Sequence, residues 1–347
     1  MKTLYLFLFA CILISSSTFA QQVTIAPFKN NANGALTLIH DDFGASWAKG
    51  IEGYVDTMCY NRNIPMCFAA ITKECDKLDW KKANEMIAHK HQIINHSMSH
   101  KCGIKQPWCE TAGSWDEHNF NVEIDSSTAL IERNTRKHPA FFIFPFDLFT
   151  DSMITYLKAK NYLGARAGKQ NMTHPINQLT PFRLNFKVRR PEDPISDLVS
   201  FANTAINEKT WAIQVLHGVE DDSWGKVGKD DYAKYLNFLV EKRKNNNLWI
   251  ANLSDVVTYQ YLKEKYNVLA EQDARGDVTK IMFTNNTSIV LPEEKLLGEQ
   301  TLTLIIKQKN KSVKKVTQNN QALKFEVRND EILIDVNPNN KDIIISY

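Results

Sequence analysis

The chain has 347 residues, with 42 Lys and Arg against 39 Asp and Glu, so its formal charge is +3. This length is enough for a sizeable core and for more than one domain. A charge this small, carried by scattered lysines, excludes an electrostatic nucleic-acid binder, because such proteins concentrate basic residues on one surface.

Residues 1–20 have the pattern of a secretory signal peptide. Lys2 precedes the apolar run 4–14, and the segment ends on the small residue Ala20. The run is too short to span a membrane, and no later segment is apolar enough to be a transmembrane segment. We therefore expect an exported protein, located in the periplasm, in the medium or at the cell surface. Cys11 raises lipoprotein anchoring as a second interpretation, which its place inside the apolar run disfavours.

Export permits disulfides, and the expected mature chain has an odd number of cysteines. At least one of them is therefore unpaired or bonds outside the chain. The spacing favours a bond between Cys102 and Cys109. A cysteine-based metal site is the alternative, although the chain has no CxxC motif. The five cysteines are Cys59, Cys67, Cys75, Cys102 and Cys109.

Residues 21–265 form the first predicted domain, in which short apolar runs alternate with amphipathic segments. Repeated strand–helix units indicate an α/β fold with a parallel sheet or barrel, whose catalytic residues gather at the C-terminal ends of the strands. The predicted strands are 36–40, 66–71, 93–96, 141–145, 163–166, 184–188, 211–217 and 249–251. The predicted helices are 79–88, with Asp79 as N-cap, and 150–160, 193–207 and 230–243.

Residues 266–347 form the second predicted domain. Apolar and polar residues alternate there, and turn-forming pairs such as Asn285-Asn286 separate the runs. We expect a small antiparallel β-sandwich with a structural role. Its predicted strands are 278–283, 288–291, 302–307, 323–327, 332–336 and 343–347.

Two short polar motifs each follow a predicted strand. His96 and His100 stand four residues apart after one strand, and Asp41-Asp42 follow another. Either motif alone is commonplace, since an HxxxH pair arises by chance and an Asp-Asp step is often a solvated turn. Together they offer two imidazoles and a carboxylate to one divalent metal, which needs at least three protein ligands. We predict that Asp42, His96 and His100 share that metal.

The order of four motifs resembles the polysaccharide deacetylases of carbohydrate esterase family four, the NodB-homology domain. These motifs are Asp41-Asp42, His96-Ser-Met-Ser-His100, Phe144-Pro145-Phe146 and Leu216-His217-Gly218. The resemblance covers roughly residues 35–260. It implies a distorted (β/α) barrel that removes acetyl groups from sugars with the help of a divalent metal.

Carried over by position, the resemblance assigns roles to individual residues. Asp42, His96 and His100 are the implied ligands of one divalent ion, with zinc expected and cobalt, nickel or manganese as alternatives. Asp41 is the implied general base and His217 the implied general acid. The backbone N–H of Phe146 is an expected donor to the tetrahedral oxyanion.

The chain departs from the family pattern in several places. Phe43 separates Asp42 from Gly44, and His40 stands where the family has an apolar aromatic residue. We expect His40 to support the ligands or to pack, with a role as a spare metal ligand as the alternative. The arginine expected before Pro145 is missing, and the family's Asp-Trp motif is not clear.

Arg166 is the predicted substitute for the missing arginine. An ordinary ion pair at a strand end is the competing interpretation of this residue.

Trp108, Trp115 and Trp224 lie near the predicted site loops and could cover the flat faces of a sugar, although each could also simply pack in the core. We therefore predict an exported, metal-dependent carbohydrate deacetylase that acts on N- or O-acetyl groups of a glycan.

A non-catalytic glycan-binding protein on the same barrel is the alternative, motivated by the missing arginine. A metal-dependent hydrolase of another amide or ester is a third interpretation. No GxSxG, Walker or GxGxxG motif supports other chemistry. The glycan and the oligomeric state stay open.

Overall fold

The long strand β2 (Gly34–Phe43) is the centre of the largest sheet in the computed structural model, which describes residues 22–109, 115–307, 312–340 and 342–347. The predicted signal peptide lies outside these residues. Strand β2 pairs in parallel with β8 (Trp211–Leu216) on one side. On its other side it pairs with β9 (Leu248–Ile250) near its start and with β3 (Cys67–Ala70) near its end. Every residue of β2 is buried.

The parallel sheet curls into a barrel with the strand order β6-β5-β4-β3-β2-β8-β7. Backbone hydrogen bonds close it, because segment 184–186 before β7 pairs with segment 165–171, which begins within β6. The prediction of a distorted (β/α) barrel is confirmed. The remaining barrel strands are β4 (Gln92–Asn95), β5 (Phe141–Ile143), β6 (Gly164–Arg166) and β7 (Lys187–Val188).

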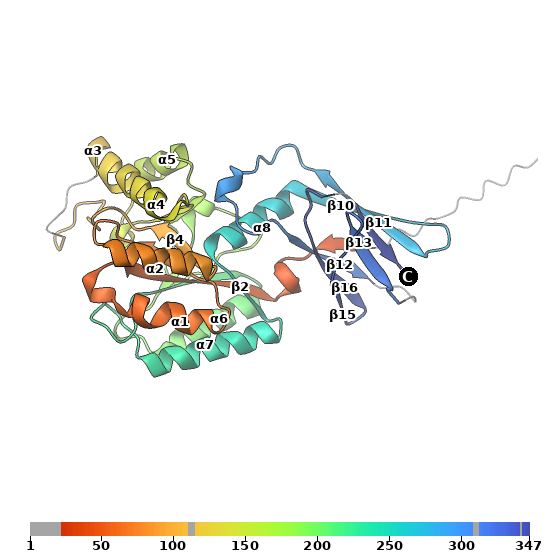
Figure 1. Cartoon of the computed structure of the whole chain (residues 1–347), viewed down its shortest axis with the longest axis horizontal. Coiled ribbons are helices and arrows are strands. Elements are labelled where there is room, and N and C mark those ends of the chain that lie inside the picture. The colour runs from red at the N-terminus through yellow and green to blue at the C-terminus, as the bar shows by residue number, and fades with distance from the viewer. Residues whose placement is uncertain (1–21, 110–114, 308–311, 341) are drawn as a thin grey trace, which may run out of the picture.

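Helices cover the outer face of the barrel sheet (Figure 1). Leu36 and Leu38 of β2 face these helices, whereas Ala35 and Ile39 belong to the inner cluster that helix α8 also contacts. Burial on both faces explains why the barrel strands read as continuous apolar runs. The helices are α1 (Asp56–Tyr60), α2 (Lys77–Ala88), α3 (Glu117–Phe120), α4 (Ser127–Thr135), α5 (Asp151–Ala159), α6 (Ile195–Glu208), α7 (Lys229–Lys244) and α8 (Leu253–Lys265).

Helix α2 begins earlier than predicted. Asp76, not Asp79, is the N-cap, and its carboxylate accepts the backbone N–H of Leu78 and of Asp79. The side chain of Asp79 accepts the N–H of Asp76 in return, which completes a capping box. The prediction was wrong because it took the acidic partner at the third position of the helix for the cap itself.

The C-terminal residues form two antiparallel sheets, as predicted. One has the strand order β1-β12-β16-β15 and the other β10-β11-β17-β13-β14. Ile281, Leu304, Ile334 and Ile345, drawn from both sheets, meet in one core cluster. The strands are β10 (Tyr266–Gln272), β11 (Val278–Asn285), β12 (Leu302–Lys307), β13 (Lys315–Gln318), β14 (Gln321–Ala322), β15 (Phe325–Arg328), β16 (Glu331–Val336) and β17 (Ile343–Ser346). The strand predicted at 288–291 is wrong, since the chain makes turns there.

The first described strand, β1 (Val23–Ile25), lies within the residue range predicted for the barrel domain but pairs with β12 of the sandwich. Helix α8 runs from the barrel to the sandwich and leads directly into β10 (Figure 1). Tyr259 and Leu262 of α8 form a buried cluster with Leu302 of β12. The two parts of the molecule therefore share apolar packing.

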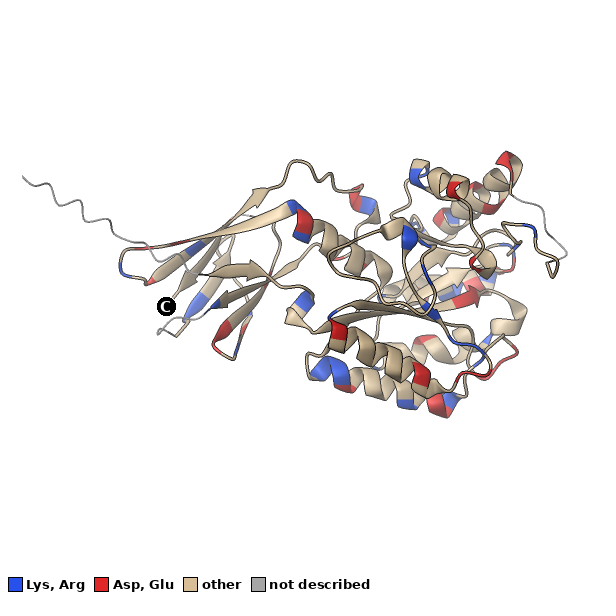
Figure 2. Cartoon of the chain, turned by 180° about the vertical axis from the view of Figure 1, so that it is seen from behind, with Lys and Arg blue, Asp and Glu red and all other residues tan. Residues whose placement is uncertain are grey.

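Acidic and basic residues are interspersed over the molecule (Figure 2). Within the described part of the chain, no helix combines the length and the apolar character needed to cross a bilayer.

Candidate functional site

The C-terminal ends of the barrel strands surround a cavity of about 520 Å³. Six of the barrel strands lead into its lining residues, which is where catalytic groups of barrel enzymes collect. The described residues that line it are Asp41, Asp42, His96, His100, Trp108, Phe146, Asp147, Arg166, Gln170, Val188, Arg190, His217 and Trp224.

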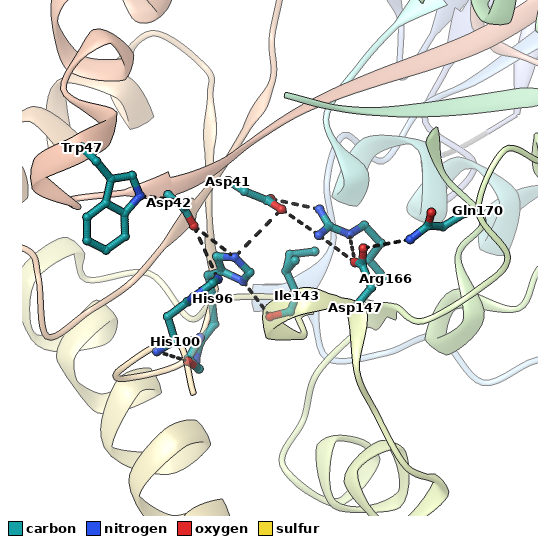
Figure 3. Close-up of polar contacts among 11 residues, drawn as sticks. Asp41, Asp42, Trp47, His96, His100, Ile143, Asp147, Arg166 and Gln170 are labelled. Carbon is teal, nitrogen blue, oxygen red and sulfur yellow. Dashed lines mark hydrogen bonds and ion pairs between the residues drawn. The ribbon is translucent and has the colours of Figure 1, made fainter. Parts of the chain in front are cut away.

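Asp42, His96 and His100 converge at one side of this cavity (Figure 3). The Oδ1 atom of Asp42 lies 3.5 Å from Nε2 of His96 and 3.6 Å from Nε2 of His100. Ligands held about 2.1 Å from a tetrahedral ion stand about 3.4 Å apart, so this spacing fits such an ion. Oδ1 of Asp42 is buried and has no hydrogen-bond partner among the described residues. The three side chains therefore fit a divalent metal.

The protonation of the two imidazoles also suits metal binding. Nδ1 of His96 donates to the backbone oxygen of Ile143 at 2.9 Å, which leaves the Nε2 lone pair directed at the cluster. Burial and the neighbouring His96 ring lower the pKa of His100 to about 4, so this ring is neutral at neutral pH. Burial lowers the pKa of His96 as well, but Asp41 and Asp42 outweigh burial and raise it. A metal and a proton therefore compete for Nε2 of His96.

Buried polar groups hold the turn that carries the histidines. The N–H of Ser97 donates to Oδ1 of Asn95, and the N–H of His100 donates to Oγ of Ser97. Glu123, which is also buried, accepts both the N–H and the O–H of Ser99. These bonds hold the turn geometry that brings both imidazoles to one point.

Trp47 flanks the Asp41-Asp42 motif in the sequence, but its contact with the metal cluster was not predicted. Its indole N–H donates to Oδ2 of Asp42 at 3.0 Å (Figure 3). This bond fixes the carboxylate so that Oδ1 faces the two histidines. The five-residue spacing between Asp42 and Trp47 does not predict this contact, because the contact depends on the turn that follows β2.

Arg166 lies against Asp41. A substitute for the missing arginine must make this contact. Its two terminal nitrogens donate to the two oxygens of Asp41 at 2.9 and 2.7 Å. Burial favours the neutral form of Asp41, but the Arg166 guanidinium and His96 hold its pKa below the usual range. Asp41 is therefore ionised at neutral pH. Its Oδ2 lies 3.9 Å from Nε2 of His96, beside the candidate metal position.

Asp147 is the second residue that the sequence analysis missed. Its Oδ1 accepts hydrogen bonds from Nε and a terminal nitrogen of Arg166 at 3.1 and 2.9 Å, and Gln170 reaches its Oδ2 (Figure 3). Burial raises the pKa of Asp147, although Arg166 opposes that effect. Arg166 is thus held between two carboxylates.

The backbone of the site is strained. Asp42, Ser97, His100, Phe146 and Asp147 all have left-handed φ angles, between 54° and 70°. For a bulky residue such as Phe146 this conformation is a genuine outlier. Strain of this kind costs about 1–3 kcal/mol per residue and clusters at functional sites, where the surrounding fold maintains it.

His217 follows β8 and lines the cavity, with its buried Nδ1 free of any hydrogen-bond partner in the described chain. His40 holds the backbone of His217 in place, since Nδ1 of His40 donates to the backbone oxygen of His217. Nε2 of His40 accepts from the buried hydroxyl of Tyr232 at 2.9 Å. Burial lowers the pKa of His40 to about 4, so this ring is a neutral support and not one of the clustered ligand residues.

Aromatic rings form the cavity walls. Trp108 packs edge-on to Phe146, which in turn contacts His100, while Trp224 packs edge-on to His217. Trp108, Phe146 and Trp224 are about half exposed. Trp108 lies in a loop closed by the disulfide Cys102–Cys109, which the spacing had favoured.

The structure corrects the expectation for Trp115. This side chain is buried, packs edge-on to Phe142 in a core cluster, and is not among the described residues that line the cavity. Nearness to the metal motif in sequence misled the prediction, because the Trp115 side chain packs in the core with Phe142 and Phe144.

A second cluster of metal-ligating residue types, Asp56, His89 and His91, does not fit a metal. Nδ1 of His91 accepts the backbone N–H of Met66, so Nε2 carries the proton and offers no lone pair to an ion. The ammonium of Lys82 lies 2.5 Å from Asp56 and already balances its charge. This group is a buried ion-pair network.

A closed parallel barrel with a carboxylate and two histidines clustered at its strand ends defines the class of this molecule. Residues 35–165 match the family model described as "Polysaccharide deacetylase". This segment is therefore similar to the polysaccharide deacetylase family, as the order of its motifs predicts. No curated protein sequence matches the chain.

Several solved structures are similar to part of the chain. The Xyl-CE4 domain of a multidomain xylanase from the hindgut metagenome of Trinervitermes trinervoides has 13% identity and a TM-score of 0.42, over 64% of this chain and 89% of that one. A family 4 acetyl xylan esterase from Clostridium thermocellum, in complex with a cobalt ion, has 14% identity and a TM-score of 0.43, over 65% and 90%. A CE4 family pseudoenzyme from Bacillus anthracis has 11% identity and a TM-score of 0.40, over 65% of each chain.

Proposed function

We propose that this protein is an exported, divalent-metal-dependent carbohydrate deacetylase that hydrolyses N- or O-acetyl groups of a glycan. The observation that carries the proposal is the cluster of Asp42, His96 and His100, which opens on the cavity beside the ionised Asp41. The match of residues 35–165 to the deacetylase family supports the substrate class.

Asp42, His96 and His100 would hold the ion, with zinc expected and cobalt, nickel or manganese as alternatives. When bound, the ion would supply Lewis acidity that activates water and polarises the acetyl carbonyl.

Asp41 serves as general base in this proposal. Its carboxylate is ionised, faces the cavity and lies beside the candidate ligands, so it can accept the proton of the attacking water. Arg166 holds both oxygens of Asp41 in one plane and thereby orients it.

His217 serves as general acid and delivers a proton to the departing amine or alkoxide. It lines the same cavity, and its backbone is fixed by the neutral His40. The N–H of Phe146, in the left-handed turn after β5, is the proposed donor to the tetrahedral oxyanion.

Metal analysis of purified variants tests the site. We expect about one divalent ion per chain in the wild type, following three-ligand hydrolytic sites, and almost none in Asp42→Ala or His96→Ala. His89→Ala is the matched control, because His89 belongs to the second cluster and its loss should leave the metal content unchanged. Full metal content in Asp42→Ala would overturn the proposed site.

Acetate release from acetylated xylan, chitooligosaccharide and peptidoglycan tests the reaction. We expect release from at least one of them, its loss after chelation and its recovery on adding zinc or cobalt. Asp41→Asn should keep the metal and lose acetate release, because it removes the base and leaves the ligands. Undiminished release by this variant would exclude Asp41 as the base.

A non-catalytic glycan-binding protein is the alternative that the missing arginine motivated. The two hydrogen bonds from Arg166 to Asp41 account for that departure and favour the enzyme. Glycan binding without acetate release from any substrate in the metal-loaded protein would favour the alternative.

Export is proposed from residues 1–20 and from the disulfide Cys102–Cys109, which an oxidising compartment permits. N-terminal sequencing of the protein recovered outside the cytoplasm should begin at Gln21. A chain recovered with Met1 in the cytoplasm would contradict export, and a lipid-modified Cys11 would support the lipoprotein alternative.

A further inference from the structure

Arg190 stands beside the candidate acid His217 at the mouth of the barrel. Strands β7 and β8 are parallel and paired in register at Val188 and Val215, and the N–H of Arg189 continues this pairing to the oxygen of Val215. Arg190 and His217 each stand two residues further along the chain, and both line the cavity. Side chains two residues apart share one face of a strand, so Val188 and Arg190 both point into the cavity that they line.

The charge of Arg190 is unbalanced. The other arginine of the cavity, Arg166, is buried between Asp41 and Asp147. The side chain of Arg190 is exposed and has no hydrogen bond or ion pair within the described residues. Among the described lining residues, Asp41, Asp42 and Asp147 would balance Arg166 and a divalent ion, so the guanidinium of Arg190 is the lining charge that is left without a counterpart.

The position of Arg190 identifies the part of a substrate that it meets. In the proposed reaction, His217 would deliver its proton to the leaving group, which is the sugar, whereas the acetyl group would lie beside the metal cluster and Phe146. Arg190 is on the His217 side, together with Trp224, so it faces substituents of the sugar ring or of a neighbouring sugar.

We propose that the glycan carries an anionic substituent, a carboxylate or a sulfate, and that Arg190 binds it. This inference rests on the proposed function, because it takes the cavity to be a glycan site. A guanidinium recognises such groups through paired N–H donors, and aromatic walls such as Trp224 cover the adjacent sugar face. Arg190 is thus a specificity-determining residue and takes no part in the acetyl chemistry.

Equilibrium titrations of the full, metal-loaded chain test this inference with probes that have no acetyl group. Xylo-oligosaccharides of one length are compared in neutral, glucuronic-acid-substituted and sulfated form. We expect at least one anionic form to bind about three- to tenfold tighter than the neutral form, the range of a partly exposed charged hydrogen-bonded pair. This preference should vanish in Arg190→Ala, partly return in Arg190→Lys and weaken at high salt.

Arg133→Ala is the matched control, because it removes an exposed arginine of α4 that does not line the cavity. It should leave the preference unchanged. Equal binding of all probes by the wild type, or an anion preference that survives in Arg190→Ala, would overturn the inference. If only the carboxylated probe or only the sulfated probe loses affinity in Arg190→Ala, the result supports the inference and identifies which anionic group Arg190 binds. Because no probe can be deacetylated, a failure of the deacetylase proposal appears separately, in the acetate assay.

Discussion

The indole of Trp47 controls which oxygen of Asp42 is available to a metal. Its N–H bond to Oδ2 leaves Oδ1 facing His96 and His100. We expect Trp47→Phe to lower zinc affinity about 10- to 100-fold, as the loss of a partner that orients a ligand typically does. Competition with a chromophoric chelator measures this affinity.

Trp224→Phe is the control for that measurement, because Trp224 lines the same cavity but contacts His217 and not the ligands. Its zinc affinity should equal that of the wild type. An unchanged affinity in Trp47→Phe would show that the indole bond does not position Asp42.

Glu52 makes stability depend on pH. Burial raises its pKa from 4.5 to about 7, although Lys49, with Nζ 3.6 Å from Oε1, opposes this effect. Between these two values the folded state holds the proton more tightly than the unfolded chain, so the free energy of unfolding falls as pH rises through that window. Above pH 7 the loss is complete and amounts to at most about 3 kcal/mol.

Glu52→Gln removes this titration. We expect the variant to be more stable than the wild type in urea at pH 8 and nearly equal to it at pH 4.5. Glu208→Gln, an exposed change on α6, should shift neither midpoint. The urea midpoint of the wild type should decrease more from pH 4.5 to pH 8 than that of Glu52→Gln. An equal change in the two proteins would contradict the raised pKa of Glu52.

The sequence predicted which residues would meet at the candidate metal site, because His96, His100 and Asp42 follow strands whose ends share one edge of a parallel sheet. It also predicted Arg166 by the same reasoning. It could not predict Asp147, because the side chain turns toward Arg166 only through the left-handed conformations of Phe146 and Asp147.

At the scale of elements, the loop closed by Cys102 and Cys109 carries Trp108 to the cavity. We expect the double variant Cys102→Ser/Cys109→Ser to weaken oligosaccharide binding about as much as Trp108→Ala, because an open loop no longer holds the indole against Phe146. Acetate assays should show a higher KM with a nearly unchanged kcat, since neither change touches the acetyl chemistry. A double variant with wild-type KM would show that the disulfide does not position Trp108.

The barrel strands were predictable because both of their faces are buried, which makes them continuous apolar runs between helical segments. Strand β10 was not predicted. It directly continues α8 without a turn residue, so nothing in the sequence marks the change from helix to strand. The run 288–291 has the composition of a strand, yet Val290 is 82% exposed and finds no sheet partner in the described chain.

At the scale of the molecule, Leu302 of the sandwich packs on Tyr259 and Leu262 of α8. We expect Leu302→Ala to cost about 2–4 kcal/mol, as other buried leucine truncations do. All seven tryptophans lie between Trp47 and Trp249, and of these Trp249 packs against this cluster, so tryptophan fluorescence reports mainly on the barrel. If the two domains unfold together, this sandwich mutation should shift the fluorescence midpoint in urea.

Val290→Ala is the control, because this exposed side chain should contribute little. A fluorescence midpoint that stays at the wild-type value in Leu302→Ala, while the far-ultraviolet circular dichroism of the strands is lost earlier, would show that the domains unfold separately.

Strand β1 and its partner β12 lie at opposite ends of the molecule's sequence, with Ile25 opposite Leu304. During synthesis Ile25 leaves the ribosome long before its partner exists, so β1 waits unpaired while the intervening chain emerges. The barrel can assemble in this interval, because all of its strands lie between the two partners. Completion of the four-stranded sheet then joins a segment made early with segments made late in synthesis.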